Sequence, residues 1–124
     1  MIRTPVCDLL DIEHPIAPGG MGSASSPAMN AAVFRAGGLG AVGCHYLTPE
    51  QVRERAEAVR KETNKPFDLN FLLFDVREDS FAEALKFRLV VMQFAWARQN
   101  QELAPYFDRS HEVGCKVTYM GGAV

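Results

Sequence analysis

The feature that most constrains the fold of this chain is a regular alternation of short apolar runs with segments that carry helix signals. The apolar runs lie at residues 16–17, 39–43, 67–74, 89–96 and 115–120. Strands that alternate with helices of this length are joined by right-handed crossovers and form a parallel sheet. The alternation therefore predicts an α/β domain with five strands, in the order β-α-β-α-β-α-β-α-β.

The segments between the apolar runs carry residues that begin helices, mainly a serine or threonine whose oxygen can accept from the backbone N–H groups of the first turn. The expected starts are Ser26 followed by Pro27, the capping box of Thr48 and Gln51, the capping box of Ser80 and Glu83, and Leu103. Helical spacing then predicts which side chains face the core. They are Met29, Ala32, Val33, Ala36, Val52, Ala56, Val59, Phe81, Ala84 and Leu85.

Length and composition limit the classes of protein to which this chain can belong. The 124 residues suit one domain, 1–124, and the net charge of −2 without a basic block argues against nucleic-acid binding. No apolar run approaches the ~20 residues of a membrane span, and acids interrupt the first residues, so neither a span nor a signal peptide is expected. Cys7, Cys44 and Cys115 are few and far apart. They predict buried thiols in a reducing, cytoplasmic setting and no metal site.

Two architectures share this order of elements. One is an open doubly wound sheet, and the other is part of a (β/α)₈ barrel. Both bind ligands at the carboxyl ends of their strands, so the pattern alone does not choose between them. The residues expected at those ends are Gly19, Gly20, Met21, Gly22, Cys44, His45, Tyr46, Asn70, residues 93–96 and residues 119–121.

Several of these residues have both a structural and a functional interpretation. The glycines Gly20 and Gly22 either form a tight turn or let the backbone approach a flat or anionic ligand. Met21 either covers a barrel floor or packs on an aromatic ring through its sulfur. Asn70 is an amide inside an apolar strand, so it either caps backbone groups or binds a ligand. His45 is expected at a strand end, where a histidine can act in acid–base chemistry, but the sequence indicates no carboxylate that would orient its ring.

Four sequence blocks carry a resemblance to a known family. They are His14-Pro15-Ile16, Ala36 to Gly40, Tyr46 to Gln51, and Lys65-Pro66-Phe67 with Asn70. Together they resemble the N-terminal part of the nitronate monooxygenases, formerly called 2-nitropropane dioxygenases. The likeness is specific up to Phe71 and continues more weakly to about Val117.

The resemblance implies a TIM barrel that binds FMN without a covalent bond. It implies oxidation of alkyl nitronates, small-molecule substrates, by dioxygen to a carbonyl compound and nitrite. Related barrels reduce enoyl thioesters or quinones with NAD(P)H and FMN. By this resemblance, Gly20, Met21 and Gly22 would lie along the flavin and Asn70 would hydrogen-bond it.

Two departures from the family pattern qualify that expectation. The family's catalytic histidine follows the fourth strand, where this chain has Ala95. Alanine cannot accept a proton, so the usual base is absent unless His45 replaces it. A TIM barrel also takes ~250 residues, and only about five of its eight strands are expected here. The loops that hold the cofactor's phosphate normally follow the last two strands.

The sequence thus predicts the N-terminal part of an FMN-dependent, nitronate monooxygenase-like barrel. Self-association or a C-terminal half would complete that barrel, and without either one we expect weak or no FMN binding and no activity. One alternative is a degenerate fragment or interaction module without catalysis. Others are an enoyl or quinone reductase and a flavodoxin-like binding domain.

Overall fold

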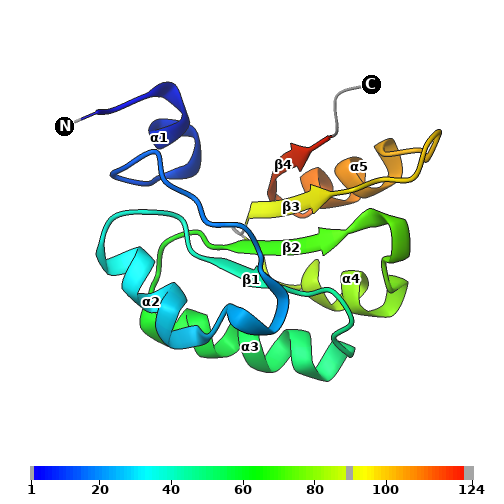
Figure 1. Ribbon diagram of the computed structural model, residues 1–124, viewed down its shortest axis with the longest axis horizontal. Coiled ribbons are helices and arrows are strands. Elements are labelled where there is room, and N and C mark those ends of the chain that lie inside the picture. Colours follow the sequence, from blue (N-terminus) through cyan, green and yellow to red (C-terminus); the bar gives the residue numbers. More distant parts are fainter. Residues whose placement is uncertain (1, 89–90, 122–124) are drawn as a thin grey trace.

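The computed structural model describes residues 2–88 and 91–121, which form a parallel sheet with helices packed against it (Figure 1). The helices are α1 (Pro5–Leu10), α2 (Pro27–Arg35), α3 (Pro49–Glu62), α4 (Glu78–Ala84) and α5 (Ala104–Glu112), with short 3-10 turns η1 (Gly22–Ala24) and η2 (Leu73–Asp75). The strands are β1 (Ala41–Gly43), β2 (Asp68–Leu72), β3 (Val91–Ala95) and β4 (Lys116–Met120). Their spatial order follows the chain order, which confirms the predicted α/β architecture.

The two faces of the sheet have different neighbours. Leu69 and Phe71 of β2 and Phe94 of β3 belong to one apolar cluster with the inward-facing side chains of α3 and α4. Residues of the opposite parity, such as Asn70 and Gln93, lie on the other face, because successive side chains of a strand alternate. Figure 1 shows α2 and α3 together along one side of the sheet, while α1 stands apart near the start of the strands.

The expected strand at residues 16–17 is wrong, so the described residues hold four strands and not five. The segment does run beside the sheet, since the carbonyl of Ile16 accepts from the Leu39 N–H at 2.9 Å. Pro15 and Pro18 flank it and have no N–H to donate, which limits ladder formation. Of the predicted strand at 89–96, Leu89 and Val90 lie outside the described residues.

The expected helix starts are correct for α2 and α3 and wrong for α4. Ser26 accepts from the Met29 N–H, and the capping box of Thr48 and Gln51 is present. The helix α4 begins at Glu78, so Ser80 is its third residue and not its N-cap. The Ser80 hydroxyl instead donates to the Leu47 carbonyl at 2.6 Å, which ties α4 to the segment after β1.

The predicted core face of α2 is displaced by one residue. Asn30, Ala31 and Phe34 are its buried side chains. Asn30 is buried because its amide oxygen accepts from the Ala41 N–H at 2.9 Å and its nitrogen lies 3.3 Å from the Ser25 hydroxyl. The side chains expected in its place are partly or fully exposed: Met29, Ala32, Val33 and Ala36. The prediction for α3 is confirmed, since Val52, Ala56 and Val59 are buried.

Asn30→Ala is expected to lower the free energy of unfolding by about 1–3 kcal/mol, because it leaves the buried Ala41 N–H without its acceptor. Urea unfolding followed by circular dichroism measures this change. Asn64→Ala is the matched control, since Asn64 is exposed. A loss at Asn30 no larger than the loss at Asn64 would contradict the role assigned to this amide.

The helix α1 covers the amino end of the sheet. No pattern in the sequence predicted this helix. Its Cys7 and Leu10 pack with Ile12, Leu39 and Val91 in a second apolar cluster. Cys7, like the other two cysteines, is buried as expected. None of the described helices has the length and the apolar run that crossing a membrane requires.

Candidate functional site

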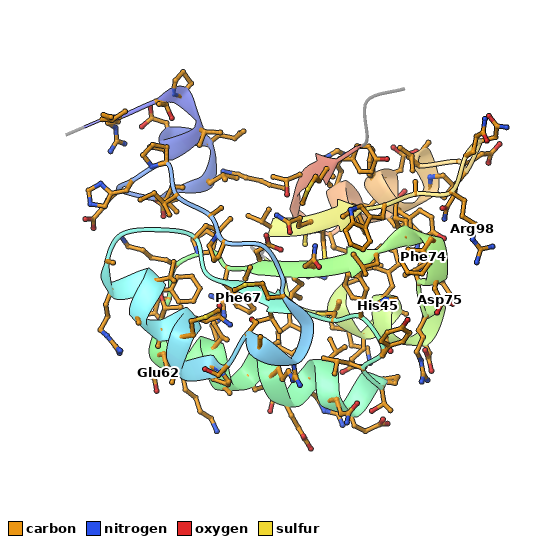
Figure 2. All side chains as sticks on the ribbon, in the orientation of Figure 1. His45, Glu62, Phe67, Phe74, Asp75 and Arg98 are labelled. Atoms are coloured by element: carbon orange, nitrogen blue, oxygen red, sulfur yellow. The ribbon has the colours of Figure 1, made fainter. Side chains whose placement is uncertain are left out.

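A pocket of about 320 Å³ opens at the carboxyl end of the strands. Figure 2 shows His45 and Phe74 at this end of the sheet. The lining residues come from five separate segments: Gly20, Met21, Gly22, Gly43, His45, Tyr46, Asn70, Leu72, Gln93, Ala95, Trp96 and Met120. The structure therefore brings six of the residues expected at the site, Gly20, Met21, Gly22, His45, Asn70 and Ala95, into one pocket.

Two amides on neighbouring strands form the polar part of the pocket. Asn70 and Gln93 pair in register, and the Asn70 Nδ2 donates to the Gln93 Oε1 at 2.8 Å. Asn70 is only 6% exposed. Thr118 follows Gln93 in the register, and its hydroxyl is buried with no hydrogen-bond partner within the described part of the chain. A row of polar groups thus crosses the sheet below the apolar mouth of the pocket.

Glycine is required at two places where the loop of residues 19–22 meets the sheet. A Cβ on Gly20 would lie 2.3 Å from the Asn70 Oδ1. A Cβ on Gly43 would lie 2.4 Å from the Gly20 carbonyl oxygen. Real Cβ atoms do not approach other atoms so closely. The loop can therefore lie against β1 and β2 only because Gly20 and Gly43 have no side chain. A Cβ on Gly19 would meet no atom within 4 Å.

Three residues with large side chains at the mouth of the pocket have a left-handed backbone conformation. Met21, Tyr46 and Trp96 have φ values of 42°, 63° and 54° and are all more than half exposed. This conformation costs an L-residue about 1–2 kcal/mol. Such strain is concentrated at ligand clamps and active sites. Because the three residues come from three different segments, they surround the mouth with apolar surface.

His45 lies against aromatic rings on the pocket wall. Its ring centroid is 3.6 Å from that of Tyr46 and 5.4 Å from that of Phe74. The Nε2 atom is buried and has no hydrogen-bond partner among the residues that the structure describes. The neighbouring Cys44 is on the other side of β1, and burial raises the pKa of its thiol. Thiol chemistry in the pocket is therefore not supported by Cys44.

Asp68 lies at the start of β2, on the same face as Asn70. It is fully buried, and neither carboxylate oxygen has a hydrogen-bond partner in residues 2–88 and 91–121. Burial raises the pKa of this carboxyl well above its ordinary value. Asp68 does not line the pocket. It was overlooked in the sequence, although an acid inside an apolar run is as unusual as the neighbouring amide.

Two lining residues were also missed, and some expected ones lie elsewhere. Gly43 and Leu72 complete the pocket, and alternation along β2 places Leu72 on the face of Asn70. Gly19, Cys44, Phe94, Tyr119 and Gly121 were expected at the site but do not line the pocket. No lysine, arginine or carboxylate in residues 2–88 and 91–121 contributes to the lining. Within the described residues, no three histidine, cysteine or acidic side chains gather as metal ligands would.

The family model of the nitronate monooxygenases matches residues 3–118 of this chain. Among curated relatives, a Mycobacterium tuberculosis enzyme is 30% identical over 128 aligned positions, covering 98% of this chain and 34% of its own length. That enzyme is named (3aS,4S,5R,7aS)-5-hydroxy-7a-methyl-1-oxo-octahydro-1H-indene-4-carboxyl-CoA dehydrogenase. A probable nitronate monooxygenase of Staphylococcus aureus is 36% identical over 68 residues, covering 55% of this chain and 19% of its own length.

Solved structures match over nearly the whole chain. FabK from Thermotoga maritima superimposes with a TM-score of 0.85 at 35% identity, over 96% of this chain and 37% of that protein. A nitroalkane oxidase from Streptomyces ansochromogenes superimposes with a TM-score of 0.77 at 18% identity, over 94% of this chain and 42% of that protein. Both are TIM barrels, so the parallel sheet corresponds to part of a barrel. The chain spans about a third of the length of its curated relative from M. tuberculosis.

Proposed function

The chain belongs to the nitronate monooxygenase family, and we propose that its pocket is the ring-binding side of an FMN-dependent oxidoreductase site. The observation that carries this proposal is the contact of Gly20 with Asn70 at the carboxyl end of a parallel sheet. Barrel enzymes bind their ligands at that end. Glycine backbone next to a buried amide offers a flat surface with hydrogen-bonding groups, which suits a planar heterocycle.

The residues present fit the ring of FMN better than its phosphate. The volume of about 320 Å³ lies at the small end of ligand pockets. Leu72, Trp96 and Met120 supply apolar wall, and the Asn70 amide supplies a hydrogen-bonding partner. The described part of the chain contributes no lysine or arginine to the lining that could bind a phosphate. We therefore propose that the phosphate depends on groups outside this pocket, supplied by a C-terminal half or by a second copy of the chain.

FMN, when bound, accepts electrons from a substrate and passes them to dioxygen or another acceptor. The residues of this chain have simpler tasks in the proposed site. Asn70, held by Gln93, orients the ring. Met21, Tyr46 and Trp96 shield the mouth from water. Ala95 cannot remove a proton, so the substrate must arrive already ionised, as an alkyl nitronate does.

A second candidate function is the reduction of an enoyl thioester. It is favoured by the 35% identity to FabK and by the relative that acts on a CoA thioester. Reduction would use NAD(P)H as the electron donor and needs no base at Ala95. A non-catalytic interaction module is the remaining alternative. For either enzyme we propose a cytoplasmic location, which fits buried thiols.

The chain supplied with FMN is expected to release nitrite and consume dioxygen with propyl-2-nitronate but not with neutral 2-nitropropane. Ala95→His is expected to extend turnover to the neutral compound, because it adds a base to the pocket wall. Nitrite release and oxygen consumption are the measurements. Reduction of a crotonyl thioester by NADPH without nitrite release would favour the second candidate. Bound FMN without any turnover would favour the non-catalytic alternative.

A further inference from the structure

His45 is held in place by the backbone on both sides. The Cys44 N–H donates to the Asn70 carbonyl at 2.8 Å, which fixes the residue before it to β2. The Leu47 N–H donates to the Cys44 carbonyl at 3.2 Å, and the Leu47 carbonyl accepts from Ser80 of α4. His45 and Tyr46 are therefore the two central residues of a turn whose ends are tied to different elements. These hydrogen bonds fix the backbone at His45 before any ligand arrives.

The imidazole has packing partners but lacks a polar one at Nε2. Tyr46 and Phe74 contact the ring, and the Nε2 atom is removed from solvent with no hydrogen bond within the described residues. A buried polar atom without a partner is destabilising, and most such atoms in proteins are paired. Since His45 lines the pocket, a ligand there can pair with Nε2 once a small rotation of the ring turns that atom toward the pocket.

The remaining lining indicates what kind of ligand atom this is. Asn70 and Gln93 already bond to each other, and no lysine, arginine or carboxylate of the described residues contributes to the wall. Within that part of the chain, His45 is the lining side chain that offers an imidazole N–H as a donor. Hydrogen bonds from an imidazole N–H are strongest to an oxygen that bears negative charge. A ligand with an oxyanion would therefore gain more from His45 than a neutral ligand of the same size.

We propose that the Nε2–H of His45 donates a hydrogen bond to an anionic oxygen of the substrate, such as a nitronate oxygen, and so selects oxyanionic ligands. The inference rests on the proposed function for the place of the substrate in the pocket. It assigns His45 to substrate binding, and not to the removal of a proton from carbon. It also gives a reason for a histidine on this wall while the family's catalytic position holds Ala95.

The test uses the full chain labelled at its histidines, observed by heteronuclear NMR with propyl-2-nitronate and with neutral isobutyramide as probes. His14 and His111 are internal controls, because neither lines the pocket. The nitronate is expected to shift the Nε2 resonance of His45 and to leave those of His14 and His111 in place. Isobutyramide is expected to have a much smaller effect on His45.

His45→Phe keeps the aromatic packing and removes the donor. It is expected to weaken nitronate binding about tenfold or more, since a hydrogen bond to a charged oxygen is stronger than one between neutral groups. His111→Gln is the matched control and should leave nitronate affinity unchanged. The inference is overturned if the His45 resonance does not respond to nitronate, or if His45→Phe, folded by circular dichroism, binds nitronate as well as the parent chain. Flavin fluorescence in the same samples reports FMN binding, and so the proposed function, separately.

Discussion

Gly20→Ala is expected to abolish FMN binding and to lower the free energy of unfolding by about 1–3 kcal/mol, the usual cost of overpacking. The added methyl group would lie 2.3 Å from the Asn70 Oδ1 and 2.6 Å from its Cβ and Cγ. Asn70 cannot move aside easily, because it is buried and its amide nitrogen is bonded to Gln93. The loop must move instead, which separates the glycine backbone from the amide. Flavin fluorescence and urea unfolding measure the two effects.

Gly19→Ala is the matched control for this change. Its methyl group would meet no atom within 4 Å, so both stability and FMN affinity should be retained. Adding Asn70→Ala to Gly20→Ala removes two of the three obstructing atoms, Oδ1 and Cγ, and leaves the Cβ at 2.6 Å. It should recover part of the lost stability without recovering FMN binding, as expected for residues in direct contact. Equal effects of alanine at Gly19 and Gly20 would contradict the packing of the loop against β2.

Asp68→Asn is expected to stabilise the chain increasingly as the pH rises. The pKa of Asp68 is raised in the folded chain, so above its ordinary value of 3.8 the unfolded chain loses a proton that the folded chain keeps. Unfolding then becomes more favourable with rising pH, with a limiting slope of about 1.4 kcal/mol per pH unit for one proton. The loss continues until the pH passes the raised pKa of the folded state. Asparagine has no proton to lose, so its variant lacks this slope.

Urea unfolding of the parent chain and of Asp68→Asn between about pH 4 and pH 8 checks this prediction. The two curves of stability against pH should meet at the acid end and separate toward neutral pH. Glu57→Gln is the control, since Glu57 is exposed and its removal should not change the slope. Parallel curves for the parent and Asp68→Asn would show that the carboxyl is not buried without a partner.

Periodicity and capping chemistry were sufficient to predict most of the architecture. The stripe of Val52, Ala56 and Val59 and the capping box at Thr48 are local patterns, and both are present. The errors arose where a polar side chain serves a distant backbone group. Asn30 is counted as polar by any hydropathy pattern, yet it is buried because it accepts from the Ala41 N–H. Ser80 was taken for a cap because its tertiary partner, Leu47, cannot be seen in the local sequence.

The position of the pocket was predictable, but its shape was not. The rule that ligands bind at the carboxyl ends of parallel strands places Met21, His45 and Asn70 together. The left-handed backbone at Tyr46 and Trp96 was not predictable, since bulky residues rarely adopt it and carry no sequence signal for it. The orphaned Nε2 of His45 depends on the packing of Phe74 and is likewise a property of the assembled fold.

The central claim is that FMN binds at the carboxyl end of the sheet, with its ring on Gly20 and Asn70. A second pocket lies between α2 and α3, and Arg35 and Lys61 line it. Its two cations make it the alternative binding site for a phosphate compound. The most direct measurement is the set of backbone amide resonances that move when FMN is added to the labelled chain. The account predicts saturable shifts at residues 20–22, 43–46, 70 and 93–96. Shifts centred on Arg35 and Lys61, or no saturable shifts, would contradict it.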